Sequence, residues 1–299
     1  YRIHPTPDCR DVSTDIPYTC DGNTNTTDFI QRVIDLERPD IIIHTGDVID
    51  GNTHTAAEGM DALYGVSIAN NLPWAASLGN HDDDSDETRP QVMQHIVNME
   101  NTLSTMNSLG DSYGNFYLEI YGNKEDTPMF RTWHFDSDTK NASINTQQVE
   151  WYTSTESTLI TVNSLAFFHV PTKEYLTALF HKDSQVCGGI MEHPSFSKSD
   201  NNIVDAFSGN IKATFAGHDH TNDYCVYMPR DAAEGIQLCY EGSPGYQGYG
   251  KCNARGNNCL KRRTRVTEIT KFGQQINSWK RLDDYAETGS ASVIDRQVL

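Results

Sequence analysis

The stretch DIIIHTGDV, residues 40–48, contains a β-branched apolar run that is followed by a glycine and an aspartate. A continuous run of this kind is expected of a strand that is buried on both faces. Gly46 permits a tight backbone turn at the end of that strand, because glycine tolerates dihedral angles that other residues avoid. The stretch therefore predicts a buried strand of an α/β sheet that delivers Asp47 to the sheet edge.

Apolar strand-like stretches and amphipathic helices alternate along the rest of the chain. One helix is predicted before residues 70–74, NNLPW, and a second from about residue 89 to residue 109. The stripe of the second helix consists of Val92, Ile96, Met99, Leu103 and Met106. The other predicted elements are a helix at 146–160 and strands at 73–82, 115–122, 129–136, 164–170, 211–217, 223–228, 236–242, 263–270 and 274–281. This alternation, without a repeat or a linker, indicates one α/β domain over residues 1–299.

Composition and charge argue against several classes of partner. The 299 residues include 41 Asp and Glu against 23 Lys and Arg, which gives a formal net charge of −18. This charge repels phosphate backbones and anionic lipids, so we expect no nucleic acid as a bulk partner. The longest apolar runs are strand-sized and far shorter than the roughly 20 residues that span a bilayer, so we expect no membrane segment.

Seven cysteines indicate an oxidising compartment and a secreted, extracellular protein. Their number does not determine their connectivity, and we expect sequence neighbours to pair: Cys9 with Cys20, Cys225 with Cys239, and Cys252 with Cys259. This pairing leaves Cys187 as a thiol or as a partner of another chain. N-x-S/T sequons at Asn25 and Asn141 are weak support for a glycosylated surface.

Polar side chains follow four of the predicted strands at the point where each strand ends. They are Asp47, Asn80 with His81, His169, and His218 with His220. Because strand-end loops converge in open α/β sheets, we expect these side chains to share one site. A carboxylate, an amide oxygen and imidazoles suit Zn, Fe or Mn better than Mg or Ca. The sequence therefore predicts a transition-metal site.

Each of these signals has a simpler structural interpretation when it is taken alone. A Gly-Asp after a strand is often a turn, and a single histidine at a strand end is more often a core residue than a ligand. The order G-D, G-N-H, H, G-H-x-H over four strands favours the metal site. The remaining histidines that we weighed are expected to be structural (His44, His95, His134 and His181) or to lie in loops (His54 and His193).

Two further segments leave alternatives open. The basic residues within 261–265 are expected to form a solvated surface, with phosphate docking as the alternative. The loop at 242–250, GSPGYQGYG, is either a wall of the pocket, with Tyr246 and Tyr249, or a long turn.

The blocks GDVIDG, GNHD, FFHVPTKEY with its lone His169, and GHDH resemble those of the calcineurin-like metallophosphoesterases, which include the purple acid phosphatases. Within that family the chain is most similar to small single-domain purple-acid-phosphatase-like proteins of plants and fungi. The likeness extends from about Cys9 to about Ile269. It implies a four-layer α/β/β/α sandwich, here without its first strand.

The resemblance also implies a centre of two transition metals, chosen from Fe, Zn and Mn. Asp47 would bridge the two ions. Asn80, His169 and His218 would complete one site, and His220 would belong to the other.

The reaction implied is hydrolysis of a small phosphate monoester by a hydroxide that bridges the metals, without a covalent intermediate. His81 would protonate the leaving group, and Asp82 would orient His81. Larger plant members of the family have a tyrosine three residues after the bridging aspartate. Here that position holds Asp50, so the tyrosine that gives the purple colour is missing there.

The family begins with a D-x-H block at the end of its first strand, and none is found upstream of Asp47. We expect the sequence given to start just after that block. His4 and Asp8 are poor substitutes, because the prolines around them make the stretch irregular. A naturally degenerate site is the alternative. The functions that stay open are a phosphomonoesterase, a phosphodiesterase, and a non-catalytic, metal-stabilised binding protein.

Overall fold

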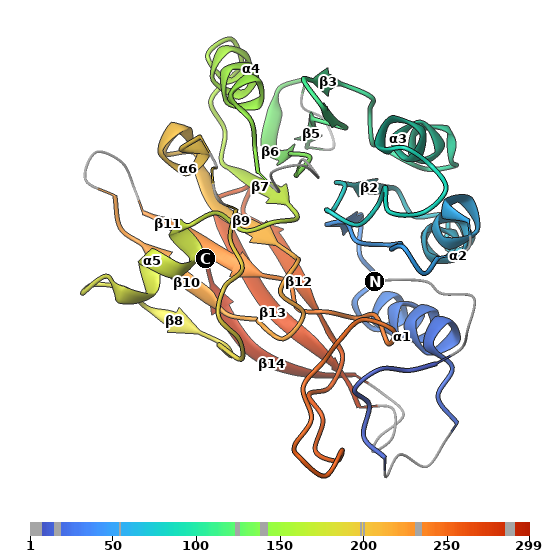
Figure 1. The fold of residues 1–299 in the computed structure, drawn as a ribbon. Helices are drawn as coiled ribbons and strands as arrows, with labels where there is room; N and C mark the ends of the chain where they lie inside the picture. Colours follow the sequence, from blue (N-terminus) through green and yellow to red (C-terminus); the bar gives the residue numbers. More distant parts are fainter. Residues whose placement is uncertain are drawn as a thin grey trace.

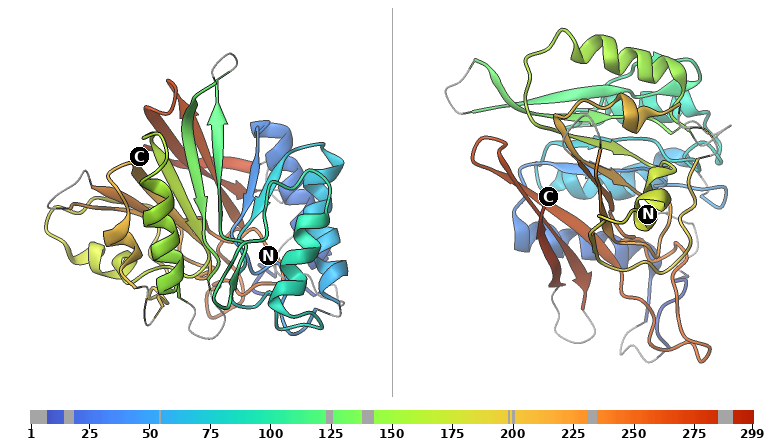
Figure 2. Two further views of the ribbon diagram at one scale, coloured as in Figure 1. Left: turned by 90° about the horizontal axis from the view of Figure 1, so that it is seen from above. Right: turned by 90° about the vertical axis from the view of Figure 1, so that its left-hand side faces the viewer.

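A computed structural model of the chain describes residues 8–14, 19–53, 55–122, 126–137, 143–197, 199, 201–230, 235–284 and 291–299. Figures 1 and 2 show four layers, with two β layers between two layers of helices. One helical layer contains α1 (Gly22–Glu37), α2 (Ala56–Ala69) and α3 (Arg89–Asn98). The other contains α4 (Thr146–Glu156), α5 (Glu174–Thr177) and α6 (Ile203–Ala206), with the 3-10 turn η1 (Ala178–Phe180) after α5. This arrangement confirms the predicted α/β fold class.

The larger β layer is a seven-stranded mixed sheet. In spatial order its strands are β5 (Phe116–Tyr121), β6 (Pro128–His134), β7 (Ser164–Phe168), β9 (Ile211–Ala216), β11 (Ile236–Tyr240), β10 (Cys225–Met228) and β8 (Val186–Cys187). Strands β6, β7, β9 and β11 run parallel to one another, and the other three run antiparallel to their neighbours. The carboxyl ends of β7 and β9 therefore meet at one edge, where His169 and His218 follow.

The second β layer contains two smaller sheets. Strand β1 (Ile42–His44) pairs in parallel with β2 (Trp74–Ala76). Strands β12 (Arg263–Thr270), β13 (Gln275–Asp283) and β14 (Ala291–Val298) form an antiparallel sheet. A short hairpin of β3 (Ser108–Leu109) and β4 (Ser112–Tyr113) lies apart from both. The loops after β1 and β2 carry Asp47 and Asn80.

Three apolar clusters hold the four layers together. One between α4–α6 and the main sheet includes Trp133, Tyr152, Phe168 and Phe207. Another between the β layers includes Phe130, Leu165, Phe167, Phe215 and Ile276. The third, between α1–α3 and the β1–β2 pair, includes Ile34, Met60, Leu63 and Trp74. Strand β7 supplies alternate residues to the first two clusters, which explains its unbroken apolar sequence.

The helix predicted at 89–109 is too long. Helix α3 ends at Asn98, and Met99 is already extended with ψ 155°. The chain then pairs with the edge of β2: Trp74 N donates to Asn101 O and Leu103 N donates to Trp74 O, at 3.1 and 2.7 Å. Leu103 is 40% exposed, so it does not belong to a buried helical face, although its spacing matched the predicted stripe. Pairing with β2 outweighs the helical pattern here.

The sequence pattern did not indicate helix α1 or strand β14. Helix α1 buries Phe29, Ile30 and Ile34, which is too sparse a stripe to stand out. Its first turn contains Asn25, whose side-chain oxygen accepts from Asp21 N at 2.8 Å. The predicted sequon there thus has a structural role, and Asn141 lies outside the described residues.

The three disulfides join the predicted sequence neighbours: Cys9–Cys20, Cys225–Cys239 and Cys252–Cys259. Cys187 is in no disulfide. It lies opposite Cys225 on the neighbouring strand. No helix in the described ranges is long and apolar enough to cross a membrane.

A buried histidine should make the fold sensitive to acid. The His134 ring stacks between Phe116 and Phe167, with centroids 4.4 and 5.3 Å away, and burial lowers its pKa to about 3. The unfolded chain takes up this proton near pH 6.5, so the free energy of unfolding should fall as pH decreases from about 6.5 toward 3. The slope for one such group is about 1.4 kcal/mol per pH unit.

His134→Phe should remove that slope contribution while keeping the ring stack. Urea unfolding at several pH values would measure the change. His95→Gln is the matched control, because His95 is partly exposed and bonded to the surface residue Asp61. Equal slopes for the wild type and His134→Phe would contradict the prediction.

Candidate metal centre

Asp47 occupies a strained turn directly after β1. Its φ is 54°, and Gly46 before it has φ 90°. A Cβ on Gly46 would lie 2.2 Å from Gly79 N, and one on Gly79 would lie 2.3 Å from Asp47 Oδ1. The loops after β1 and β2 are therefore in direct backbone contact, and both glycines are needed for that contact.

The carboxylate of Asp82 joins these two loops. It accepts hydrogen bonds from the backbone N–H groups of Asp47, Val48, Ile49 and Gly79, at 2.9, 2.8, 3.2 and 2.7 Å. Asp82 is buried. We expected Asp82 to orient His81, but its oxygens are directed at the backbone that carries Asp47.

His81 instead contacts Asp84. Its Nδ1 lies 2.5 Å from Asp84 Oδ2, and its backbone N–H donates to Asp47 Oδ1 at 3.0 Å. The side chain is 34% exposed, so a substrate can reach the ring. Sequence reasoning missed Asp84, although its position in the run of aspartates at 82–84 was a signal.

Three predicted ligands converge on one point. Ligand atoms of Asp47, His169 and His218 all lie within 4.8 Å of one another. The rings of His169 and His218 are nearly perpendicular, with centroids 5.3 Å apart. His169 Nδ1 donates to Thr45 O at 2.6 Å, which leaves Nε2 directed at Asp47. A backbone carbonyl on one ring nitrogen is the usual way to direct the other toward a metal.

The polar atoms of this group fit a cation. His169 Nε2 lies 3.1 Å from Asp47 Oδ2, close enough for electrostatic attraction. Within the described part of the chain, neither this nitrogen nor Asn80 Oδ1 has a hydrogen-bond partner, although both are buried. Buried polar atoms are rarely left in this state. An ion bound by Asp47, Asn80, His169 and His218 would satisfy both atoms.

The electrostatics of the group suit metal binding. Burial alone would raise the pKa of Asp47, but His169 and then His81 hold it well below the usual range. Burial, reinforced by His169, lowers the pKa of His218 to about 4. Because ligands must be deprotonated, these shifts suit metal binding by Asp47 and His218. Against the effect of burial, the Asp47 charge raises the pKa of His169, so an ion would have to displace a proton from that ring.

His220 belongs to the same cavity but not to the same cluster. It lines a polar cavity of about 50 Å³ together with Asp47, His169 and His218. Its Nδ1 lies 3.1 Å from Tyr249 O. Glu241 forms another part of the wall, and its carboxylate accepts from Thr45 Oγ1 at 2.5 Å. Burial raises the pKa of Glu241 to about 7, against the opposing effects of Thr45 and Arg265.

The basic segment at 261–265 is not the solvated surface that we expected. Arg262 and Arg263 are buried. Arg263 donates to His220 O at 3.2 Å and to Thr221 O at 2.6 Å, and it pairs with Asp223 at 2.7 Å. The loop after β9 needs donors for its inward carbonyls, and these arginines supply them.

Arg89 is a second supporting residue that the sequence did not reveal. It is buried and binds the carboxylate of Asp136 through Nε and Nη2. It also donates to Gly79 O at 2.8 Å and to Ser137 O at 2.6 Å. Ser137 Oγ in turn accepts from His169 N at 3.1 Å. Arg89 thus connects the loop after β2 to the loop that carries His169.

The other histidines within the described ranges lie away from the cluster, and His4 is outside those ranges. His44 and His134 are buried in the core, and burial lowers the pKa of each to about 3. His95 bonds Asp61, and His181 and His193 are exposed. His54 lies outside the described residues.

Comparisons with known proteins point to one family. The family model for calcineurin-like phosphoesterases matches residues 3–222. Probable inactive purple acid phosphatase 14 of Arabidopsis thaliana is 33% identical, over 97% of this chain and 79% of that protein. Phosphatase DCR2 of Saccharomyces cerevisiae is 29% identical, over 88% of this chain and 49% of that protein. A dimetal phosphatase from Danio rerio has a TM-score of 0.54 at 11% identity, over 92% and 88% of the two chains, which shows likeness of fold.

Asp82→Asn should destabilise the protein by about 2 to 4 kcal/mol, because it removes the charge that binds four buried N–H groups. Asp84→Asn is the matched control. It makes the same change two residues away on a side chain that is 40% exposed, and should cost less than about 0.5 kcal/mol. Chemical denaturation of both variants tests this; equal midpoints would refute the role of Asp82.

Proposed function

The chain belongs to the calcineurin-like phosphoesterase family, and on that premise we propose that it is a two-metal phosphoesterase that hydrolyses small phosphate monoesters. One observation carries the proposal. His169 Nε2 is buried beside Asp47 and His218 without a hydrogen-bond partner in the described ranges. Asn80 Oδ1 is likewise buried and unpartnered there, and it follows Gly79, which packs against Asp47. A set of oxygen and nitrogen ligands with unsatisfied atoms is best explained by a transition metal such as Fe, Zn or Mn.

Each ligand has an assigned place in this proposal. Asn80, His169 and His218 would hold one ion with Asp47, and His220 would hold the second, with Asp47 shared between them. Two bound metals would supply an activated water and neutralise the charge of the phosphoryl group. The protein's own part is to fix the ligands, and Asp82, Thr45 and Arg89 do so through the contacts described above.

His81 is proposed to give a proton to the leaving group. With Nδ1 at 2.5 Å from Asp84 Oδ2, its Nε2 is the nitrogen available to a substrate. A proton donor of this kind typically contributes a factor of about 10² to 10⁴ to the rate. Asp84, rather than Asp82, would keep the ring in position.

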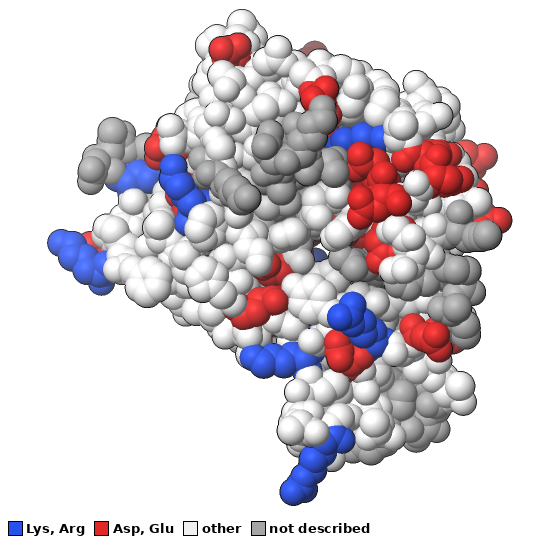
Figure 3. Space-filling model, viewed as in Figure 1, with Lys and Arg blue, Asp and Glu red and all other residues white. Residues whose placement is uncertain are grey.

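The negative surface does not exclude an anionic substrate. Figure 3 shows acidic side chains gathered over the region between β2 and α3, where the sequence runs DDDSDE at 82–87. Bound metal cations dominate the local field at such sites. Substrates that are small enough to reach the metals, and that carry few negative charges away from the phosphate, should be favoured. We also propose that the protein acts outside the cell, which its three disulfides support.

A non-catalytic, metal-stabilised binding protein is the second candidate function. The names of three relatives from Arabidopsis thaliana, probable inactive purple acid phosphatases 14, 28 and 29, favour it. In that case the ligand set would hold a metal and a phosphorylated ligand without turnover. The two candidates differ in whether His81 matters.

Metal binding should depend on the shared aspartate. With the family's D-x-H block present, we expect two transition metals per chain; without it, we expect at best the ion held by Asn80, His169 and His218 with Asp47. Asp47→Asn should weaken metal affinity by at least about 100-fold, since loss of an outer partner alone costs about 10- to 100-fold. Asp61→Asn is the control, because Asp61 is a surface carboxylate with a side chain 64% exposed. Calorimetry and metal analysis would test this. A metal content that Asp47→Asn leaves unchanged would contradict the assigned ligands.

Activity should depend on His81. The metal-loaded protein should hydrolyse an aryl phosphate monoester faster than an aryl diester. His81→Gln should lower kcat by about 10² to 10⁴ and leave metal content unchanged. His95→Gln should leave both unchanged. Binding of inorganic phosphate without turnover would favour the non-catalytic candidate, and a preference for the diester would overturn the substrate class.

A further inference from the structure

The loop at 242–250 encloses His220, and we propose that Tyr249 in this loop is a positioning residue that sets the orientation and the tautomer of the His220 imidazole. The inference rests on the proposed two-metal function, in which His220 binds the second ion. The sequence left this loop as either a pocket wall or a long turn. The contacts of Tyr249 with His220 show that this part of the loop packs against a proposed metal ligand.

The ring of His220 is confined on a face and along an edge. Its face stacks on the Tyr249 ring, with the centroids 4.0 Å apart and the planes within 7° of parallel. Along the edge, a Cβ on Gly248 would lie 2.6 Å from His220 Cε1 and 2.7 Å from Nδ1. The backbone at Gly248 therefore packs directly against the imidazole. Rotation of the ring out of this slot would require movement of the loop.

Tyr249 also makes polar contacts with both the ring and the backbone of His220. His220 Nδ1 lies 3.1 Å from Tyr249 O, and a carbonyl can only accept, so Nδ1 carries the proton. The His220 backbone N–H donates to Tyr249 Oη at 3.1 Å. In the neutral ring, Nε2 is then the nitrogen with a lone pair for a metal. The ring lines the cavity that Asp47 and His218 share.

The hydroxyl of Tyr249 is itself held in place. It donates to Glu192, whose carboxylate oxygens lie 3.0 and 3.1 Å away. Glu192 Oε1 also accepts from Thr221 N at 2.8 Å. The carboxylate thus ties Tyr249 to the residue that follows His220.

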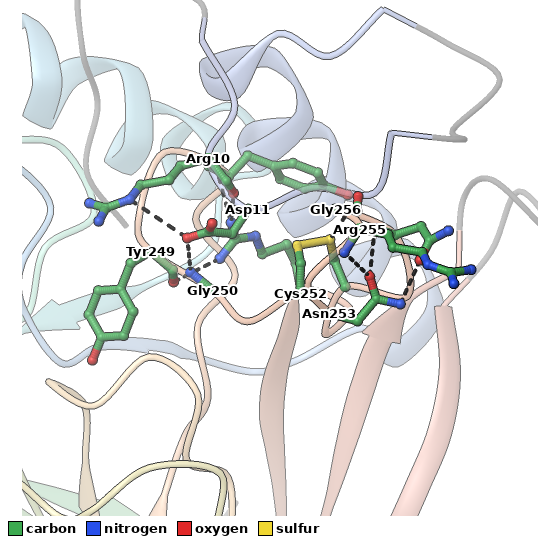
Figure 4. The surroundings of a disulfide bond; sticks show 12 residues. Arg10, Asp11, Tyr249, Gly250, Cys252, Asn253, Arg255 and Gly256 are labelled. Carbon is green, nitrogen blue, oxygen red and sulfur yellow. Dashed lines mark hydrogen bonds and ion pairs between the residues drawn. A yellow bond between two sulfur atoms is a disulfide. The ribbon is translucent and has the colours of Figure 1, made fainter.

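The backbone of the loop is anchored from the opposite side. Arg262 donates to Tyr249 O at 3.2 Å and to Gly248 O at 3.0 Å. Gly250 N donates to Asp11 Oδ2 at 2.9 Å, an interaction that Figure 4 shows beside the Cys252–Cys259 disulfide. The carbonyl that fixes the His220 tautomer is therefore part of a rigid frame. This frame acts on His220 as Thr45 O acts on His169.

Two substitutions separate the parts of this contact. Tyr249→Leu removes the stacked ring and the hydroxyl but keeps the backbone carbonyl. Tyr249→Phe keeps the ring and the carbonyl and removes only the hydroxyl. Tyr246→Phe is the matched control in the same loop, because its hydroxyl bonds Asp283 at 2.7 Å, away from His220.

The first readout is the tautomer of His220 in the metal-free full chain, from long-range proton–nitrogen NMR at about pH 8, where a histidine of ordinary pKa is neutral. His220→Gln identifies the signal. We expect the Nδ1–H form in the wild type and in all three tyrosine variants, because each keeps the backbone carbonyl of residue 249. The His220 ring should keep one orientation in the wild type, Tyr249→Phe and Tyr246→Phe, and adopt several in Tyr249→Leu, which lacks the stacked ring; averaged nuclear Overhauser effects from the His220 ring protons would show this. The second readout is the affinity for the second Zn²⁺ by calorimetry. It should fall about 10- to 100-fold in Tyr249→Leu and less in Tyr249→Phe.

The two readouts separate the failure of this inference from the failure of the proposed function. A His220 ring that keeps its single wild-type orientation in Tyr249→Leu would overturn the positioning role, whatever the metal content. If the wild type, with the family's D-x-H block present, binds only one Zn²⁺, the two-metal function fails, but the orientation of the His220 ring still decides the role of Tyr249. If Tyr249→Leu does not fold, Tyr249→Phe decides by the second affinity. A value equal to that of Tyr246→Phe would count against the inference.

Discussion

The carboxylate of Asp82 is the contact on which the proposed metal centre depends. Four backbone N–H groups from two loops converge on its two oxygens. This convergence keeps Asp47 in a left-handed conformation that costs free energy in any residue but glycine. The same loop supplies Thr45 O, which orients His169. Buried Asp82 therefore positions the proposed ligand Asp47 directly. It positions His169 indirectly, through the loop that contains Thr45.

Support for the other side of the centre comes from a different part of the chain. Asp223 binds Arg263 and Lys280, at 2.7 and 2.8 Å, and Arg263 donates to the carbonyl of His220. Breaking a buried ion pair by removing one partner is strongly destabilising, so these residues act as a unit. The two halves of the centre thus have separate supports, one between β1 and β2 and one between β9 and β12.

The sequence predicted more of the ligands than of their supports. Strand-end positions after a glycine located Asp47, Asn80 and His218 as proposed ligands, and a strand end alone located His169. Such positions are informative because parallel strands bring their carboxyl ends together whatever the loops contain. The fold class and the disulfides followed from equally local patterns. The supporting contacts of Arg89, Arg263 and Tyr249 are with residues that are distant in the sequence. Local sequence patterns do not predict such partners. The short basic run at 261–265 suggested a solvated surface. The packing of this segment against the loop after β9 instead buries Arg262 and Arg263.

The dependence of His220 on Arg263 has a consequence for the order in which the protein is made. The two residues are 43 positions apart, so translation at roughly 5 to 20 residues per second separates them by about 2 to 9 s. During that interval the nascent chain already contains every proposed metal ligand, but not the arginine that binds the His220 carbonyl. A polypeptide released before β12 is made would contain all the proposed ligands of this chain. It would lack Arg263, which binds the backbone carbonyl of His220. Strand β12, which is synthesised after the proposed ligands, thus completes the support of the proposed centre.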